Sequence, residues 1–195
     1  MKRLVLMGGS PWKSDDMGRG LVESLIQHYP IEARVAFCIF AQPESDWRAT
    51  EQVNRELIQK FAGNTKISFQ TMTEDNFSEV SEWADIINLP GGNPFTLKEK
   101  LDLCGDVSFL WDGKVIAGSS AGADVLCEKY MFLQEKRIGE GFGWIKASCL
   151  PHWRANFDDW NDSDWNRAEA ELLHQHSTLP VLCIPEGKFI EITVR

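Results

Sequence analysis

Residues 115–126 read Val115-Ile116-Ala117-Gly118-Ser119-Ser120-Ala121-Gly122-Ala123-Asp124-Val125-Leu126. The apolar run at the start is typical of a buried strand, and the run at the end is typical of a helix. Between them stands the pattern G-x-S-x-G, with Ser120 at its centre. A nucleophile on a tight strand-to-helix turn needs small residues two positions before and after it, because the backbone crowds it there. The stretch therefore predicts an α/β protein in which Ser120 is a candidate nucleophile.

Two other interpretations of this turn stay open. Ser119 could be the nucleophile, although its own flanking positions are Ala117 and Ala121, which fit the pattern less well than two glycines. A Gly- and Ser-rich turn could also join a strand to a helix for steric reasons alone. The predicted strand–turn–helix context favours the catalytic interpretation with Ser120.

Outward from this turn, short apolar runs alternate with amphipathic stretches. Near-continuous apolar strands separated by helices are typical of a parallel sheet that is covered on both faces. We therefore expect a doubly wound α/β fold, a three-layer sandwich with a mostly parallel sheet flanked by helices, in one domain over residues 1–195. The expected strands are residues 2–7, 34–40, 66–70, 85–89 and 114–118, and the expected helices are residues 20–28, about 46–61 and 77–83.

The last forty-five residues differ from the rest, because acidic side chains dominate residues 158–171. We expect a solvated helix over about residues 164–174 there. Apolar runs at residues 181–184 and 188–194 flank a turn at Pro185-Glu186-Gly187. Two such runs joined by a short turn predict a β-hairpin.

Composition excludes several classes of function. The chain has 195 residues and a net charge of −9, so we expect binding to neither nucleic acid nor an anionic membrane. It has no apolar run long enough to span a bilayer and no signal peptide at its start, so a cytoplasmic location is the default expectation. The five cysteines include no C-x-x-C pair and are expected to be reduced thiols. We expect neither a metal nor a cofactor.

A serine nucleophile needs a base, and Pro151-His152-Trp153 offers one downstream of the turn. The loop Gly91-Gly92-Asn93 follows the strand expected at residues 85–89. Its glycines allow backbone N–H groups to approach a ligand closely, most plausibly at Gly92, although the same residues are also ordinary turn formers.

Taken together, these three segments resemble the peptidase E (aspartyl dipeptidase) family of serine peptidases, to which the cyanophycinases are related. The family pattern comprises a G-G-N-x-F-x-L loop, a G-x-S-A-G-A turn and a P-H-[FYW] segment in that order. This chain has residues 91–97, 118–123 and 151–153 at those places. The resemblance covers most of the chain and implies a fold like that of class I glutamine amidotransferases. Those enzymes have Cys at the turn and Glu two residues after the His, where this chain has Ser120 and Arg154, so glutaminase chemistry is not supported.

The resemblance implies a role for each matching residue. Ser120 would be the nucleophile and His152 the general base, and the backbone at Gly92 and Ala121 would form the oxyanion hole. The family also has an acidic residue some way after the turn, and Glu135 falls at a comparable distance. A solvated surface charge explains Glu135 equally well, and the rival acids are Glu140 and Asp158. Asp124 is disfavoured, because one helical turn past Ser120 its side chain should point elsewhere.

The implied substrate is a small peptide, with an N-terminal Asp as the family preference. Such a preference needs a cation, which Arg154 or Arg167 could supply, and Asn93 is a further candidate substrate contact. Pro94 stands where the family usually has Thr. Two alternatives remain: a serine hydrolase acting on another amide or ester, and a non-catalytic α/β module that binds a small ligand or partner.

Four tryptophans surround His152 in the sequence, and three explanations are open for them. They could line the site, pack in the core or form the interface of a homodimer. They are Trp144, Trp153, Trp160 and Trp165.

Overall fold

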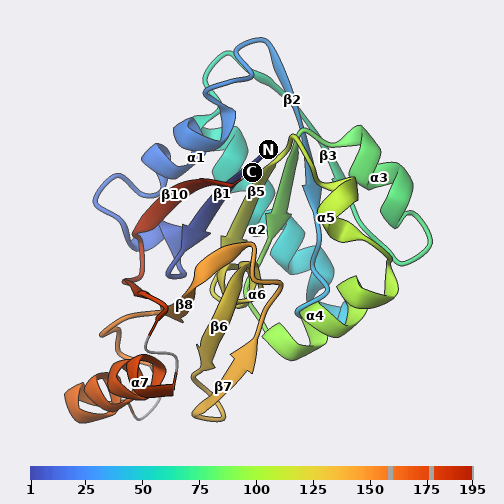
Figure 1. Ribbon diagram of the computed structural model, residues 1–195. Coiled ribbons are helices and arrows are strands. Elements are labelled where there is room, and N and C mark those ends of the chain that lie inside the picture. Colours follow the sequence, from blue (N-terminus) through green and yellow to red (C-terminus); the bar gives the residue numbers. More distant parts are fainter. Residues whose placement is uncertain (158–159, 176–177, 195) are drawn as a thin grey trace.

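The computed structural model describes residues 1–157, 160–175 and 178–194 (Figure 1). Among these residues, no helix is both long enough and apolar enough to cross a membrane. The strands are β1 (Lys2–Met7), β2 (Glu32–Phe37), β3 (Lys66–Thr71), β4 (Ile86–Leu89), β5 (Val115–Ser119), β6 (Cys127–Phe132), β7 (Arg137–Glu140), β8 (Ile145–Pro151), β9 (Val181–Ile184) and β10 (Phe189–Val194). The helices are η1 (Pro11–Lys13, a 3-10 turn), α1 (Arg19–Ile26), α2 (Glu44–Phe61), α3 (Phe77–Trp83), α4 (Pro94–Leu103), α5 (Val107–Leu110), α6 (Ala121–Leu126) and α7 (Asp162–Gln175).

A six-stranded sheet with the order β10-β1-β5-β4-β2-β3 forms the centre of the fold. All its pairings are parallel except that of β10 with β1. The predicted α/β class with a mostly parallel sheet is confirmed. Because β1, β5 and β4 are neighbours, the loops that follow them meet at one edge of the sheet, where ligands bind in folds of this type.

Helices cover both faces of this sheet, and the alternation of side chains in β1 shows how. Leu4 and Leu6 belong to the core on the side of α3, α4 and α6, whereas Val5 and Met7 belong to the core on the side of α1 and α2. All four are buried. A strand with both faces buried must be apolar throughout, which is why β1 appears as a continuous apolar run in the sequence.

Some predicted element boundaries differ from those in the structure. The strand expected over residues 34–40 is β2, which begins at Glu32 and ends at Phe37. The helix expected over about residues 46–61 is α2, which begins two residues earlier, at Glu44. Strand and helix ends are the part of a structure that local patterns determine least.

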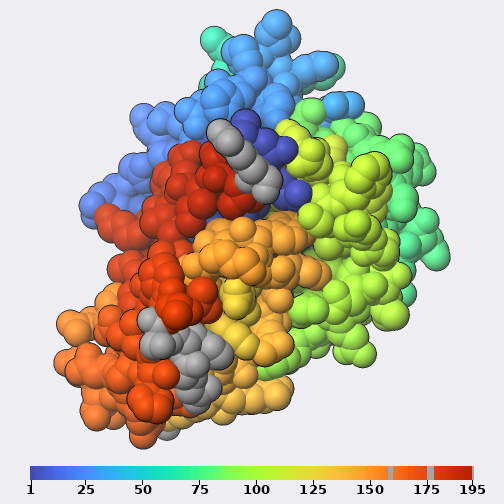
Figure 2. All heavy atoms as spheres, viewed as in Figure 1, coloured from blue at the N-terminus to red at the C-terminus, as the bar shows by residue number. Residues whose placement is uncertain are grey.

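The predicted hairpin of residues 181–194 is wrong. Strand β10 pairs with β1 in the main sheet, whereas β9 pairs with β8 in a second sheet of order β7-β6-β8-β9. Figure 1 shows β6, β7 and β8 together below the main sheet, with α7 at the lower left. In Figure 2 the orange and red atoms of the last third of the chain form a continuous part of the same face. The turn at residues 185–187 thus passes from one sheet to the other.

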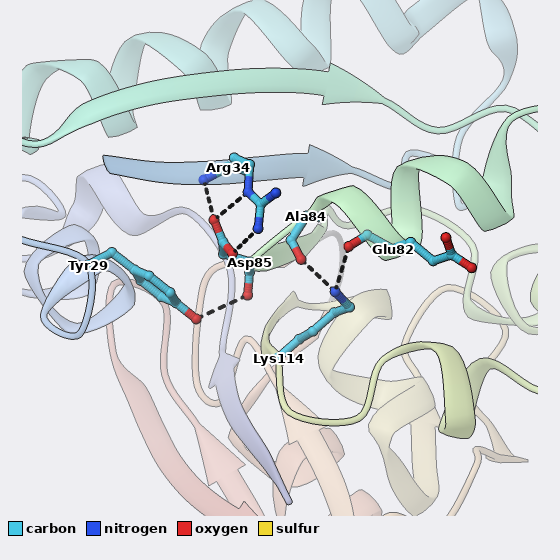
Figure 3. Close-up of polar contacts among 6 residues, drawn as sticks. All are labelled: Tyr29, Arg34, Glu82, Ala84, Asp85 and Lys114. Atoms are coloured by element: carbon cyan, nitrogen blue, oxygen red, sulfur yellow. Dashed lines mark hydrogen bonds and ion pairs between the residues drawn. The ribbon is translucent and has the colours of Figure 1, made fainter. Parts of the chain in front are cut away.

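A network of polar side chains joins the strands of the main sheet at the edge where the parallel strands begin (Figure 3). The guanidinium of Arg34 donates to both oxygens of Asp85 at 2.9 and 2.7 Å, and the Arg34 backbone amide donates to the same carboxylate. The hydroxyl of Tyr29 donates to the carbonyl of Asp85. The ammonium of Lys114 donates to the carbonyl of Ala84, just after α3. These contacts join β2 to the starts of β4 and β5, at the edge opposite the loops that follow the strands.

Candidate active site

Ser120 stands on a strained turn between β5 and α6. Its φ of 51° and ψ of −112° lie outside the usual regions for a side-chain-bearing residue. The two glycines of the motif make this turn possible. A Cβ on Gly118 would lie 2.4 Å from the backbone of Gly122, and a Cβ on Gly122 would lie 2.1 Å from the carbonyl oxygen of Leu89. The spacing G-x-S-x-G is therefore a steric requirement of this turn.

His152 follows β8 directly and reaches Ser120. Its Nε2 lies 2.9 Å from Oγ of Ser120, so Ser120 rather than Ser119 carries the hydroxyl that contacts the imidazole. The ring fits because Gly9 has no side chain: a Cβ there would lie 2.3 Å from Cε1 of His152. The two residues that the sequence predicts as nucleophile and base are thus brought into contact.

Glu186 supplies the carboxylate behind the imidazole. Its Oε1 lies 3.0 Å from Nδ1 of His152, and its Oε2 forms an ion pair with Lys13. A carboxylate only accepts hydrogen bonds, so Nδ1 carries the proton and Nε2 is left as the acceptor for the Ser120 hydroxyl. This is the tautomer that a histidine base requires.

Three consecutive carbonyl groups, of the last residue of β1 and the two residues after it, hold the three segments together. The amide of Ser120 donates to the carbonyl of Met7 at 3.0 Å, and the amide of His152 donates to that of Gly8 at 2.8 Å. The amide of Gly187 donates to the carbonyl of Gly9 at 2.9 Å. Residues distant in the sequence are therefore aligned by one short length of backbone, which makes their side-chain geometry a property of the scaffold.

Burial lowers the pKa of His152, against the opposing effect of the hydrogen bond and charge of Glu186. The positive charge of Lys13 lowers it further. Burial by itself would raise the pKa of Glu186, but its contacts with Lys13 and His152 outweigh that effect and leave the pKa below its ordinary value. At neutral pH the imidazole is therefore neutral and the carboxylate is charged, as base catalysis needs.

The loop after β4 lies over Ser120. A Cβ on Gly91 would lie 3.3 Å from Cβ of Ser120. Gly92 has a φ of 148°, and a Cβ on it would lie 2.3 Å from the carbonyl oxygen of Ala41. The side-chain amide of Gln42 donates to the carbonyl of Gly91 at 2.7 Å and so fixes this loop. The amide of Ala121, the first residue of α6, has no intrahelical acceptor.

The structure does not place Glu135 beside His152. Its carboxylate forms an ion pair with Arg137 at 2.6 Å and is half exposed. Glu140 pairs with Lys129 at the surface, and Asp158 lies outside the described residues.

The sequence patterns do not identify Glu186, because its turn resembles that of a hairpin. The pattern that could identify it is an acidic residue in the turn after a strand, at the sheet edge where the other candidate residues lie. Asp124 is buried, which raises its pKa well above the ordinary value, and its carboxyl group contacts Cys149, whereas the carboxylate that contacts His152 is that of Glu186.

The predicted substrate contacts also lie elsewhere. Asn93 caps α4, and its side-chain oxygen accepts from the amides of Phe95 and Thr96. Arg154 contacts Asn166 and lies over the ring of Trp153, and Arg167 pairs with Asp164 on α7.

An open cavity of about 500 Å³ lies in front of Ser120 and His152. Its floor is formed by the turn of Ser119 and Ser120 and by the loop of Gly91 and Gly92. The remaining lining residues come from the segment after β1, from the start of α2 and from two further positions: Met7, Gly9, Ser10, Pro11, Trp12, Gln42, Ala49, Thr50, Val53, Asn54, Pro90 and Gln134. Such a volume is typical of small-molecule sites.

The four tryptophans near His152 in sequence do not line this cavity. Trp160 and Trp165 are buried in a core with α7, and Trp153 packs edge-on against Trp165. Trp144 packs on Phe142 and Trp111. Core packing is thus the explanation that the structure supports.

The sequence matches the family model of peptidase family S51 over residues 4–194. The chain belongs to peptidase family S51. The family consists of serine peptidases of the peptidase E type, so this S51 chain is a serine-type hydrolase and the resemblance noted in its motifs is confirmed.

Solved structures share the fold. One is a peptidase from an acI-B1 Actinobacterium, with a TM-score of 0.67 and 23% identity over 98% of this chain and 83% of that one. Another is a putative peptidase E from Listeria monocytogenes EGD-e, with a TM-score of 0.67 and 15% identity over 100% of both chains. A search among curated proteins finds no significant match.

Proposed function

We propose that this S51 peptidase hydrolyses small peptides through an acyl-enzyme, with Ser120 as nucleophile, His152 as general base and Glu186 as the acid that orients it. The observation that carries the proposal is the continuous chain of contacts from Ser120 Oγ to His152 Nε2, at 2.9 Å, and from His152 Nδ1 to Glu186 Oε1, at 3.0 Å. Nucleophile, base and orienting group stand in the order and at the distances that serine hydrolases require.

In the first half of the reaction, Oγ of Ser120 attacks the carbonyl carbon of the scissile amide while its proton passes to Nε2 of His152. The tetrahedral intermediate collapses as the imidazolium returns this proton to the leaving amine, so the C–N bond breaks and the acyl group stays on Ser120. Water then attacks the ester while His152 takes its proton. As the bond between the acyl carbon and Oγ of Ser120 breaks, the imidazolium returns the proton to Oγ and the carboxylic acid leaves. Glu186 remains ionised and stabilises the imidazolium in both halves.

The developing oxyanion would be stabilised by the backbone amides of Gly92 and Ala121. The position of the Gly91-Gly92 loop over Ser120 supports Gly92, and the first amide of α6, which has no acceptor within its own helix, supports Ala121. Backbone donors fixed in this way are effective because they need no reorganisation during the reaction.

The size of the cavity supports a substrate of a few residues. The specificity for an N-terminal Asp that the resemblance implies needs a cation beside the cavity. Arg154 and Arg167, the candidates for that role, contact Asn166 and Asp164 instead.

The test is labelling with a fluorophosphonate, followed by peptide mapping and by assays of single variants. We expect the label on Ser120 and its loss in Ser120→Ala and His152→Ala. Glu186→Gln should reduce kcat by roughly 10²- to 10⁴-fold, because the neutral amide no longer stabilises the imidazolium.

Glu135→Gln is the matched control, since it makes the same chemical change in an acid that pairs with Arg137. It should retain nearly full activity. Equal losses in Glu186→Gln and Glu135→Gln, or no label on folded wild-type protein, would contradict the proposed triad.

A further inference from the structure

The cavity in front of Ser120 has no charged side chain among its described lining residues apart from the titratable His152. Its walls combine apolar groups, such as Pro11, Trp12 and Val53, with neutral polar ones. A carboxylate that is transferred from water into such a cavity loses its hydration. A cation or several hydrogen-bond donors must compensate for this desolvation cost.

The polar donors on the α2 side of the cavity are already engaged within the protein. The amide of Gln42 donates to the carbonyl of Gly91, and the hydroxyl of Thr50 donates to Oε1 of Gln42. The side-chain amide of Asn54 donates to the carbonyl of Thr50 at 2.8 Å. From these three side chains a bound carboxylate would find only the second N–H groups of Gln42 and Asn54, and such neutral donors form weaker hydrogen bonds with a carboxylate than a cation does.

Charges near the cavity also oppose an anion. Lys13 lies on the adjoining 3-10 turn, but its ammonium is held by Glu186. Near the start of α2, Glu44 and Asp46 outnumber the one base, Arg48, and the whole chain has a net charge of −9. A field of this sign lowers the local concentration of an anionic substrate.

From these observations we infer that the cavity binds an uncharged, predominantly apolar side chain on the acyl side of the scissile bond, rather than an aspartyl side chain. The inference rests on the proposed function, since it concerns the substrate that acylates Ser120. Trp12 and Val53, which are 48% and 47% exposed, would gain apolar cover when such a side chain binds.

The experiment compares the p-nitroanilides of leucine, asparagine and aspartate, which have side chains of similar size and shape but differ in charge and polarity. Wild-type kcat/KM for leucine and asparagine should exceed that for aspartate by about 10-fold or more. Fluorophosphonate labelling of Ser120 is measured on the same samples.

A pair of charge variants tests where the side chain binds. Val53→Arg places a cation at the cavity and should raise the aspartate-to-leucine ratio of kcat/KM by about 10-fold. Gln52→Arg adds the same charge at the adjacent position, whose side chain is exposed, does not line the cavity and contacts Glu56, and should leave the ratio unchanged.

The outcomes separate the two proposals. The inference would be overturned if the aspartate anilide were hydrolysed as fast as the leucine anilide, or if none of the three anilides were hydrolysed. In either case, a label on Ser120 would still support an activated serine. Equal ratios in Val53→Arg and Gln52→Arg would overturn the cavity as the binding place. A folded protein without label would overturn both proposals.

Discussion

Gly9 lies so close to His152 that a single added methyl group would overlap the imidazole. The Cβ position on Gly9 is 2.3 Å from Cε1 and 2.8 Å from Nδ1 of that ring. Gly9 also has a φ of 113°, and its carbonyl accepts from the amide of Gly187, beside Glu186. One small residue after β1 therefore makes room for the base and also anchors the turn that carries the acid.

Gly9→Ala should reduce kcat on the order of 10²-fold or more, because the ring must move away from Ser120 and small displacements of catalytic groups are costly. Gly105→Ala is the matched control, with a φ of 96° and no atom within 4 Å of the new Cβ. Both variants should lose about 1–3 kcal/mol of stability from backbone strain, measured by urea unfolding. Full activity in Gly9→Ala would contradict this assignment of the ring position.

The charge of Lys13 contributes to the pH dependence of the site, after the larger effect of burial. Burial and Lys13 hold the pKa of His152 below its ordinary value, so kcat/KM should rise with pH through that lowered pKa as the imidazole becomes neutral. Lys13→Met removes the ammonium and leaves the Glu186 charge, which favours the imidazolium, so the acid limb should move to higher pH. Lys188→Met, which removes an exposed charge two residues from Glu186, should move it less. A shift to lower pH in Lys13→Met would contradict the electrostatic role.

Gln42 is a positioning residue for the loop over Ser120. Its amide donates to the carbonyl of Gly91, and its Oε1 accepts from Thr50. Gln42→Ala should lower kcat by roughly 10-fold with little change in KM, because the loosened loop would displace an oxyanion donor. Thr50→Val, which keeps Gln42 but removes its partner, should give a smaller loss of the same kind. A change confined to KM would instead indicate that Gln42 binds substrate.

Asp85 should matter for stability and not for activity, since it precedes β4 and so lies at the opposite edge of the sheet from Ser120, which follows β5. Figure 3 shows its contacts. Its contacts with Arg34 lower its pKa, although burial opposes them. Asp85→Asn should cost about 1 kcal/mol at neutral pH, because the Arg34 side chain is partly exposed and solvent screens the pair.

The pH dependence of that difference has a definite sign. A carboxyl group with a lowered pKa in the folded state stabilises the protein at pH values above its unfolded pKa of about 3.9 and loses this effect as the pH falls through the folded value. The difference in unfolding free energy between wild type and Asp85→Asn should therefore shrink below about pH 4. A constant difference from pH 7 to pH 3 would exclude the ion pair as its source.

Local patterns were enough to predict much of the fold. The apolar run of β1 and the strand–turn–helix of residues 115–126 could be assigned because a buried strand and a crowded turn impose their residue types on neighbouring positions. Ser120 and His152 belong to short motifs of this kind. Their contact depends on the tertiary structure, because Ser120 follows β5 in the main sheet whereas His152 follows β8 in the second sheet.

Glu186 could not be assigned in the same way. Residues 181–194 have the pattern of a hairpin, and that pattern is compatible with β9 and β10 lying in either one sheet or two. The pairing of β10 with β1 and of β9 with β8 carries the turn between the sheets to His152. The order of strands in a sheet depends on which strand edges and sheet faces remain for distant segments of the chain to cover. It is therefore decided by tertiary packing.

By itself, the sequence determined the α/β class and the turn that carries Ser120, because both rest on periodicity or on backbone crowding within a few residues. It identified His152 as the candidate base from its place downstream of that turn and from the resemblance of residues 151–153 to the family pattern. The tertiary structure alone decided which carboxylate orients His152 and what lines the cavity. Both features are contacts between segments that are distant in the sequence, namely η1, α2 and the ends of strands in both sheets. Such contacts leave no pattern among neighbouring residues of the chain.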